Sequence, residues 1–365
     1  MVENLFGTDG IRGLVNLEQM ADEIAIMRLL EHREISPAIM KIIGESLGRM
    51  GTQESSQKMT VVVGWDDRPA NMKLAESLTV GLNLAEFEVI HIGLCATPTL
   101  HLATLSNNAE FGCMITASHN PSDYNGFKII RDNAKPISSK TGLKEIQRYA
   151  ESDKRYLAEK KGQYKKLDLN KEYVAKILSF IDSSILKNLK IVLNPGNGGA
   201  GEIVDRITEN LPFELIKVNY EADSSFPNGV PNPMIEENRI STSNAVIKNK
   251  ADMGIAWDGD FDRCFFFDEN GEFVEGYYLV GLLAKSFLIK QKNESIIFDP
   301  RLTWNTIDEI ERHQGKAIQC QSGHSFSHIK MELVIQVKSI VGMKHLDTGE
   351  QRLTHYYYLQ NKTTM

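Results

Sequence analysis

The chain has 365 residues, of which 42% are hydrophobic and 24% are charged. This balance is typical of a globular protein with a sizeable core and excludes collagen, coiled-coil and disordered chains. The net charge of −7 and the pI of about 5.8 argue against a nucleic-acid or anionic-membrane partner. The four cysteines are scattered without a C-x-x-C pair, and neither a secretory signal nor a membrane-spanning run is recognisable. We therefore expect a cytoplasmic protein of two or three domains.

The first part of the chain alternates buried strands with helical patterns. Short apolar runs rich in β-branched residues predict strands over 60–64, 88–93 and 111–115, and a helical period predicts a helix over 71–84. A charged helical pattern, 143–161, leads out of this region. The rhythm predicts an α/β domain with a mixed, mostly parallel sheet and with loops at the strand ends.

The same rhythm continues in the second part of the chain. Strands are predicted over 189–194, 213–218 and 251–257, with a helix over 202–210. A third unit repeats the pattern at 264–268, 273–283, 295–299 and a helix over 306–313, and the rhythm stops near Met331. The expected domains are residues 1–165, 166–262 and 263–365, the last incomplete and with an atypical tail from about residue 332.

The segment Asp258-Gly259-Asp260-Phe261-Asp262-Arg263 is the most informative motif. Three carboxylates at alternate positions after an apolar strand can converge on one hard cation, because a loop can turn all three inward. An EF-hand is excluded because Arg263 stands at the sixth position, where that loop needs glycine. A solvated acidic turn is the structural alternative. Arg263 is also suited to grip a phosphate group with its planar fork.

The loop Thr116-Ala117-Ser118-His119-Asn120-Pro121 follows a predicted strand. Ser118 has His119 beside it and Lys128 at the start of the next strand, so it is a candidate nucleophile or phosphate carrier. Taken alone, the loop favours the simpler interpretation, in which serine and asparagine satisfy backbone groups.

The N-terminal segment Phe6-Gly7-Thr8-Asp9-Gly10-Ile11-Arg12-Gly13 carries three glycines around one arginine and one aspartate. Such a backbone suits close approach to an anion. The spacing fits neither a P-loop nor a dinucleotide-binding fingerprint. The glycine-rich run 196–201 indicates tight packing of a strand against a helix rather than a nucleotide site.

These three loops together resemble the α-D-phosphohexomutase superfamily in order and spacing. Lesser signatures agree, namely Val63 to Arg68, Asn197 to Gly201, Pro231-Asn232-Pro233 and Ser322-Gly323-His324. The segments 116–137, 254–281 and 299–306 resemble the phosphomannomutase/phosphoglucomutase branch, whereas residues 5–13 are closer to phosphoglucosamine mutases. The likeness extends from Phe6 to about Met331 and implies consecutive α/β domains with mixed sheets around a central cleft.

The resemblance implies a role for each matching residue. Ser118 would be the phosphorylated serine, and Mg²⁺ would be held by Asp258, Asp260 and Asp262 with a phosphate oxygen on Ser118. Arg12 and Arg263 would steady the phosphoryl group, with His119 and Lys128 as candidates for acid–base work and Lys128 preferred. Arg301 and His324 would contact the substrate. The implied reaction interconverts mannose 6-phosphate and mannose 1-phosphate through a 1,6-bisphosphate, with glucose or mannose 1,6-bisphosphate as activator.

The sequence departs from the family after about Val334. The Gly-Glu-Met-Ser loop that selects the sugar is not recognisable, and neither is a fourth domain. We therefore expect a truncated or frameshifted mutase of impaired activity. The alternatives are a phosphoglucosamine mutase, a non-catalytic remnant that binds sugar phosphate, and a generic Mg²⁺-dependent hydrolase. The oligomeric state is not predicted.

Overall fold

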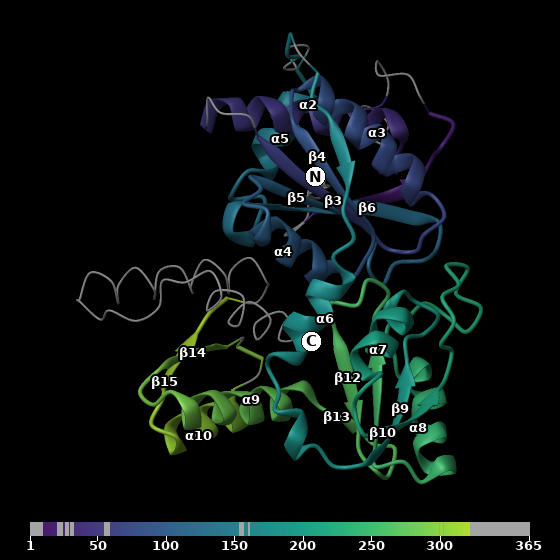
Figure 1. Cartoon of the computed structure of the whole chain (residues 1–365), viewed down its shortest axis with the longest axis vertical. Coiled ribbons are helices and arrows are strands. Elements are labelled where there is room, and N and C mark those ends of the chain that lie inside the picture. Colours follow the sequence, from purple (N-terminus) through teal and green to yellow (C-terminus); the bar gives the residue numbers. More distant parts are fainter. Residues whose placement is uncertain are drawn as a thin grey trace.

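The computed structural model describes residues 10–19, 25, 29, 33–54, 59–152, 157–159, 161–298, 300, 301 and 303–321. Within these ranges the helices and strands form three sheets with their covering helices, arranged along the chain as three α/β units. Figure 1 shows the first unit above the other two, with the second and third side by side below it. The expected fold class, consecutive α/β units with mixed sheets, is confirmed.

The first unit is built on an eight-stranded mixed sheet of order β2-β1-β6-β5-β3-β4-β8, with β7 paired to β6. Strands β3, β4, β5 and β8 are parallel, and β6 runs antiparallel between β1 and β5. The elements are β1 (Ile11–Val15), β2 (Glu34–Ile35), α2 (Pro37–Glu54), β3 (Thr60–Trp65), α3 (Asn71–Leu84), β4 (Glu88–Leu94), α4 (Thr97–Ser106), β5 (Phe111–Ile115), β6 (Tyr124–Arg131), β7 (Lys135–Pro136), α5 (Leu143–Ala150) and β8 (Tyr164–Lys166).

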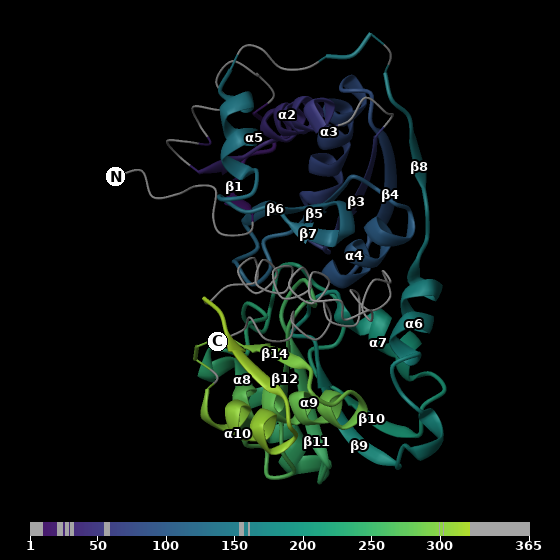
Figure 2. The same ribbon diagram turned by 90° about the vertical axis from the view of Figure 1, so that its left-hand side faces the viewer.

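Helices cover both faces of this sheet, which explains why its strands are continuously apolar. Successive residues of β3 point to opposite faces, so Val61 and Val63 pack with α2, α3 and α5, whereas Val62 packs with α4. Figure 2 shows α2, α3 and α5 on one side of the sheet and α4 on the other. Both faces are buried, and the ends of the strands are left to carry the polar loops.

The second unit is built on a five-stranded sheet of order β10-β9-β11-β12-β13. Strands β10, β9 and β11 are parallel, and β12 and β13 continue the sheet antiparallel. The elements are α6 (Asn170–Leu178), β9 (Leu189–Asn194), α7 (Ala200–Thr208), β10 (Phe213–Lys217), α8 (Glu236–Asn249), β11 (Met253–Trp257), β12 (Cys264–Phe267) and β13 (Phe273–Val274).

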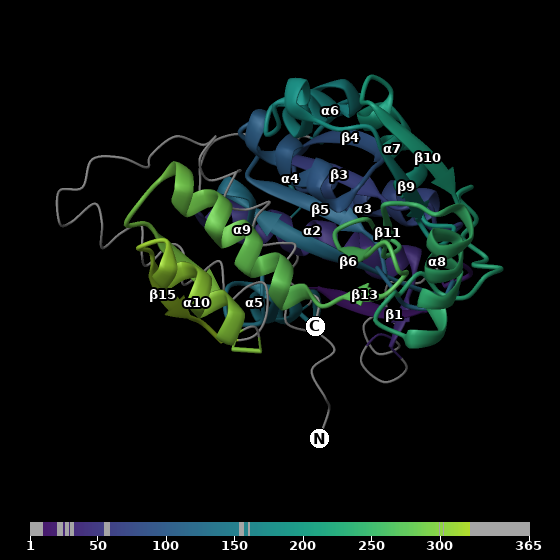
Figure 3. The same ribbon diagram turned by 90° about the horizontal axis from the view of Figure 1, so that it is seen from below.

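The third unit comprises α9 (Gly276–Lys290), β14 (Ser295–Phe298), α10 (Trp304–Arg312) and β15 (Lys316–Gln319). Strands β14 and β15 are parallel and are joined through α10. Figure 3 shows α9 and α10 lying side by side. Their shared core contains Ala284, Leu288, Ile296, Phe298 and Ile310.

Three expectations differ clearly from the structure in their boundaries. The run expected over 273–283 is divided between β13 and the first half of α9. The helix expected over 143–161 is limited to α5, because Ala158 and Gly162 donate backbone hydrogen bonds back to Leu84 and Asn83 in a non-helical path. The expected domain boundary at 262/263 falls between β11 and β12, which pair as a hairpin. We propose instead that the third unit begins at α9.

Among the residues that the structure describes, no helix is both long enough and apolar enough to cross a bilayer.

Candidate active site

Ser118 lies in the loop between β5 and β6, at the edge of the first sheet. Its side chain is fully buried, and its φ of 54° is in the left-handed region that L-residues rarely adopt. The Ser118 backbone N–H donates to Thr116 Oγ1 at 2.7 Å, and Thr116 Oγ1 donates to Asp66 Oδ2 at 2.6 Å. These buried bonds fix the backbone that carries the serine hydroxyl.

The three aspartates lie in the loop between β11 and β12, at the edge of the second sheet. Asp258 and Asp260 are buried, and oxygen atoms of Asp258, Asp260 and Asp262 all lie within 4.8 Å of one another. The turn is closed by backbone bonds from Asp258 N to Arg263 O and from Phe261 N to Asp258 O. The prediction that this motif turns its carboxylates toward one point is confirmed.

The two loops meet across the boundary between the first and second units. Ser118 Oγ donates to Asp258 Oδ2 at 3.0 Å, and Arg263 Nη2 donates to Ser118 Oγ at 3.3 Å. A Cβ on Gly259 would lie 2.5 Å from the Ser118 carbonyl oxygen, so only glycine allows this approach without a shift. The serine hydroxyl therefore lies between a carboxylate and a guanidinium.

Lys128 lies on β6, close to the aspartate cluster. Its ammonium donates to Asp260 Oδ2 at 2.7 Å and to Asp262 Oδ2 at 2.6 Å. Thr97, at the start of α4, also donates to Asp260 Oδ2, at 2.9 Å. Lys128 thus balances the charge of two carboxylates from the neighbouring unit.

The electrostatic environment separates the two buried aspartates. Burial raises the pKa of Asp258 well above its ordinary value, and the charge of Asp262 adds to this effect. Burial also opposes the charged form of Asp260, but the charge and hydrogen bond of Lys128, followed by the charge of Arg263, outweigh it and lower the pKa of Asp260. Asp260 is therefore the carboxylate most firmly held in its ionised form.

His119 is the nearest imidazole to the serine hydroxyl, with Nδ1 3.2 Å from Ser118 Oγ. Burial lowers the pKa of His119 to about 4, and the positive charges of Arg263, Arg12 and Lys128 act in the same direction. The imidazole is consequently neutral near neutral pH and can accept a proton. Arg12 lies on β1 and pairs with Gly126 of β6, the strand that carries Lys128.

The donor set of the cluster fits a hard cation. Asp260 Oδ1 and Asp262 Oδ1 are buried and have no hydrogen-bond partner among the residues that the structure describes. Oxygen ligands of this kind suit a hard divalent cation. The geometry supports a metal centre rather than a solvated acidic turn.

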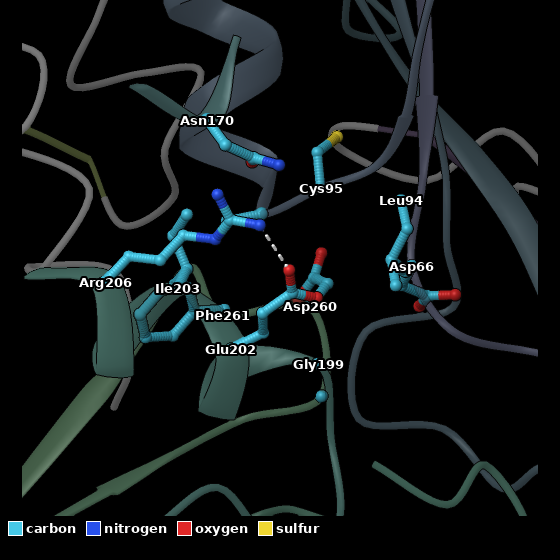
Figure 4. Close-up of a pocket in the computed structure, with 12 residues that line it drawn as sticks. Asp66, Leu94, Cys95, Asn170, Gly199, Glu202, Ile203, Arg206, Asp260 and Phe261 are labelled. Carbon is cyan, nitrogen blue, oxygen red and sulfur yellow. Dashed lines mark hydrogen bonds and ion pairs between the residues drawn. The ribbon is translucent and has the colours of Figure 1, made fainter. Parts of the chain in front are cut away.

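A small cavity of about 30 Å³ is lined in part by Gly259, Asp260 and Phe261 of the aspartate loop. Figure 4 shows Asp66 and Cys95 of the first unit on one side of it and Arg206 and Glu202 of α7 on the other. Arg206 Nη2 and Glu202 Oε1 are 2.6 Å apart, and Asp260 also lines the space. The volume is enough for one or two water molecules.

The remaining predicted residues lie elsewhere. Arg301 is exposed in the turn between β14 and α10 of the third unit. His324 lies outside the described residues. Their predicted contacts with substrate stay predictions.

Sequence reasoning missed several polar residues that support the site, among them Asp66, Thr97 and Thr116. Asp66 and Thr116 lie directly after strands, and Thr97 lies at the start of a helix. Thr97 donates to Asp260, whereas Thr116 donates to Asp66 and accepts from the backbone of Ser118. The signature Val63 to Arg68, which contains Asp66, was the available signal. Its position at the end of β3, next to β5, places it beside Ser118.

A strand-end serine that faces three strand-end aspartates across two α/β units is the arrangement that a site of the phosphohexomutase type requires. The family models agree: residues 3–157 match phosphoglucomutase/phosphomannomutase α/β/α domain I, and residues 171–271 match domain II. The chain belongs to the phosphoglucomutase/phosphomannomutase family.

Curated relatives and solved structures support this assignment. The chain is 45% identical to a phosphomannomutase of Vibrio cholerae over 329 residues, which is 89% of this chain and 69% of that protein. It is 47% identical to a phosphohexose mutase of Xanthomonas campestris, covering 81% of this chain and 64% of that protein, and 42% identical to the Escherichia coli K12 phosphomannomutase, covering 89% and 70%. The chain thus spans about two thirds of the length of these relatives.

Two solved structures share the fold. One is a phosphoglucomutase/phosphomannomutase family protein from Burkholderia thailandensis, with a TM-score of 0.78, 25% identity and coverage of 92% of this chain and 69% of that one. The other is described as a putative phosphomannomutase from Thermus thermophilus, with a TM-score of 0.75, 22% identity and coverage of 98% and 80%. The match to the second shows the fold alone.

Proposed function

We propose that the chain acts as a phosphomannomutase that interconverts mannose 6-phosphate and mannose 1-phosphate through a 1,6-bisphosphate. The observation that carries the proposal is the position of Ser118 Oγ, 3.0 Å from Asp258 Oδ2 and 3.3 Å from Arg263 Nη2. The names of the relatives from Vibrio cholerae and Escherichia coli support mannose phosphate over the glucosamine alternative.

The proposed chemistry transfers one phosphoryl group between Ser118 and a sugar hydroxyl. The hydroxyl oxygen attacks the phosphorus on Ser118, a new P–O bond forms, and the P–Oγ bond breaks. The hydroxyl proton ends on Ser118 Oγ. His119, which is neutral and 3.2 Å from Oγ, is suited to accept and return that proton. Lys128, the other acid–base candidate, donates to two carboxylates of the aspartate loop, so its positive charge is held beside the site.

Cations of the chain would stabilise the transferring group. Arg263 reaches Ser118 Oγ directly, and Arg12 adds its charge nearby. Asp258, Asp260 and Asp262 would hold Mg²⁺ together with a phosphate oxygen on Ser118. A magnesium ion bound there would neutralise charge on the phosphoryl group. A 1,6-bisphosphate of glucose or mannose would load the serine, leaving the sugar monophosphate. The cytoplasmic location stays a prediction.

The test is a mutase assay on the purified chain with mannose 1-phosphate, glucose 1-phosphate and glucosamine 1-phosphate. Mg²⁺ and a catalytic amount of glucose 1,6-bisphosphate are included, and Ser118→Ala is the control. We expect turnover of mannose 1-phosphate above the control. Preferential turnover of glucosamine 1-phosphate would overturn the substrate assignment, and phosphate release without a bisphosphate requirement would indicate a hydrolase.

A further inference from the structure

Arg68 is a buried arginine whose side-chain hydrogen bonds all go to backbone carbonyls of residues 118–124 or to Asp66, which supports the Ser118 loop. It follows β3 and is 3% exposed. Nη1 donates to the carbonyl oxygens of Pro121, at 2.6 Å, and Tyr124, at 3.0 Å. Nη2 donates to those of Ser118, at 2.9 Å, and Asn120, at 2.7 Å. Nε donates to Asp66 Oδ2 at 3.4 Å.

These bonds account for every donor that the side chain has. A guanidinium carries five N–H groups in a rigid plane, and five acceptors are present here. Arg68 therefore has no donor left for a substrate phosphate. Its action on the reaction must pass through the backbone of residues 118–124.

That backbone needs external support. The left-handed φ of Ser118 costs free energy for a residue with a Cβ. Such conformations persist only where contacts with the surrounding structure hold them in place. The carbonyl that follows this strained Cα is the one held by Arg68 Nη2. The same carbonyl is the contact point of Gly259 from the aspartate loop. Moving it would shift Ser118 Oγ relative to Asp258.

The second unit covers the guanidinium from the other side. Phe226 lies between β10 and α8, is 7% exposed, and its ring centroid is 5.4 Å from Arg68 Cζ. A cation over an aromatic face gains further stabilisation when it is shielded from water. Arg68 is thus held by both units whose loops form the site.

We propose that Arg68 is a positioning residue that sets the distance between the Ser118 hydroxyl and the aspartate cluster, and that Phe226 of the second unit locks its guanidinium in place. This inference rests on the proposed function. It assigns to the Val63 to Arg68 signature a role distinct from substrate or metal binding.

The test compares Arg68→Lys with the matched control Arg239→Lys in the full chain. Arg239 also donates to backbone carbonyls, those of Pro233 and Met234, and stacks on an aromatic ring, Phe273, at 3.8 Å. Lysine keeps the charge but cannot reproduce the planar fork. Hydrogen exchange of the peptide that covers 116–124 is measured together with the rate of Ser118 phosphorylation by glucose 1,6-bisphosphate.

In Arg68→Lys we expect exchange in this loop to accelerate about tenfold or more, because several bonds to a charged donor are lost. Exchange in β3 and α3 should stay unchanged. The maximal rate of phosphorylation should fall about 100-fold, as for a misplacement of about 1 Å. The bisphosphate concentration for half-maximal rate should not change, because Arg68 has no donor for it. Arg239→Lys should match the wild type in both readouts.

Several results would overturn the positioning role. One is unchanged hydrogen exchange in 116–124 together with an unchanged phosphorylation rate in Arg68→Lys. Another is a raised half-maximal bisphosphate concentration with an unchanged maximal rate. A third is equally faster hydrogen exchange throughout the first unit. A wild-type chain that takes no phosphoryl group would overturn the proposed function instead, and the role of Arg68 in it. If Arg68→Lys does not fold, Phe226→Leu decides. That variant keeps all five hydrogen bonds and should loosen the loop severalfold, and an unchanged loop would refute the lock.

Discussion

The two loops that form the site are held in different ways. The Ser118 loop is fixed through its backbone by the side chain of Arg68, which lies outside the loop, and by that of Thr116, its first residue. The aspartate loop closes its own turn through backbone bonds, and its side chains carry three like charges that need balancing cations. Those cations are Lys128 from the other unit and Arg263 from the loop itself. The Ser118 loop therefore depends on neighbouring structure for its backbone conformation. The aspartate loop depends on neighbouring structure for part of the positive charge that balances its carboxylates.

The largest effect is expected when a carboxylate is removed from the aspartate loop. Asp258→Asn removes the carboxylate that accepts the hydrogen bond of Ser118 Oγ, and with it one proposed metal ligand, with little change of shape. We expect the rate of Ser118 phosphorylation to fall by about 10³-fold or more, since preorganised electrostatic groups each contribute on this scale. Asp252→Asn is the control, because Asp252 is an exposed aspartate just before the other end of β11. Equal rates in the two variants would contradict the assignment.

Removing the cation that balances the cluster tests the same loop through stability. Lys128→Met leaves Asp260 and Asp262 without their shortest ion pairs. We expect a loss of about 3–5 kcal/mol in the free energy of unfolding without metal, because an uncompensated charge stays buried. Added Mg²⁺ should restore more stability to Lys128→Met than to the wild type. Thermal unfolding with and without Mg²⁺ measures this, with Lys217→Met as an exposed-pair control.

The contact between the two loops is tested at a glycine. In Gly259→Ala the new Cβ would meet the Ser118 carbonyl oxygen at 2.5 Å. We expect a loss of about 1–3 kcal/mol in unfolding free energy, typical of overpacking, together with slower phosphorylation. Gly199→Ala is a matched control, since no atom lies within 4 Å of its added Cβ. Stability and rate equal to those of the control would show that the loops do not approach as described.

A further prediction concerns the pH dependence of stability and a carboxyl group beside the Ser118 loop. Burial raises the pKa of Asp67 to about 7, and the neighbouring Asp66 adds to the shift. The folded state therefore holds a proton that the unfolded state releases above about pH 4, so stability falls as the pH rises from about 4 to about 7. Asp67→Asn should raise the melting temperature at pH 8 but not at pH 4. The same change at both pH values would contradict this linkage.

The part of the site that the sequence predicted is the part whose reacting groups are close together in the chain. Asp258, Asp260 and Asp262 alternate within one turn, and Ser118 follows a recognisable buried strand. The support of the Ser118 loop was missed because Arg68 and Thr97 are brought to it only by the sheet order and by the contact between units. The β11–β12 hairpin was divided between two units because a short apolar run does not show which sheet it joins.

The most direct test of the central claim is a mass spectrum of the purified wild-type chain after incubation with glucose 1,6-bisphosphate and Mg²⁺. The account predicts one phosphoryl group on the peptide that contains Ser118, its absence from Ser118→Ala, and its removal by added mannose 1-phosphate. A folded wild-type chain that carries no phosphate on Ser118 would contradict the account. So would an Asp258→Asn variant that is phosphorylated on Ser118 as efficiently as the wild type.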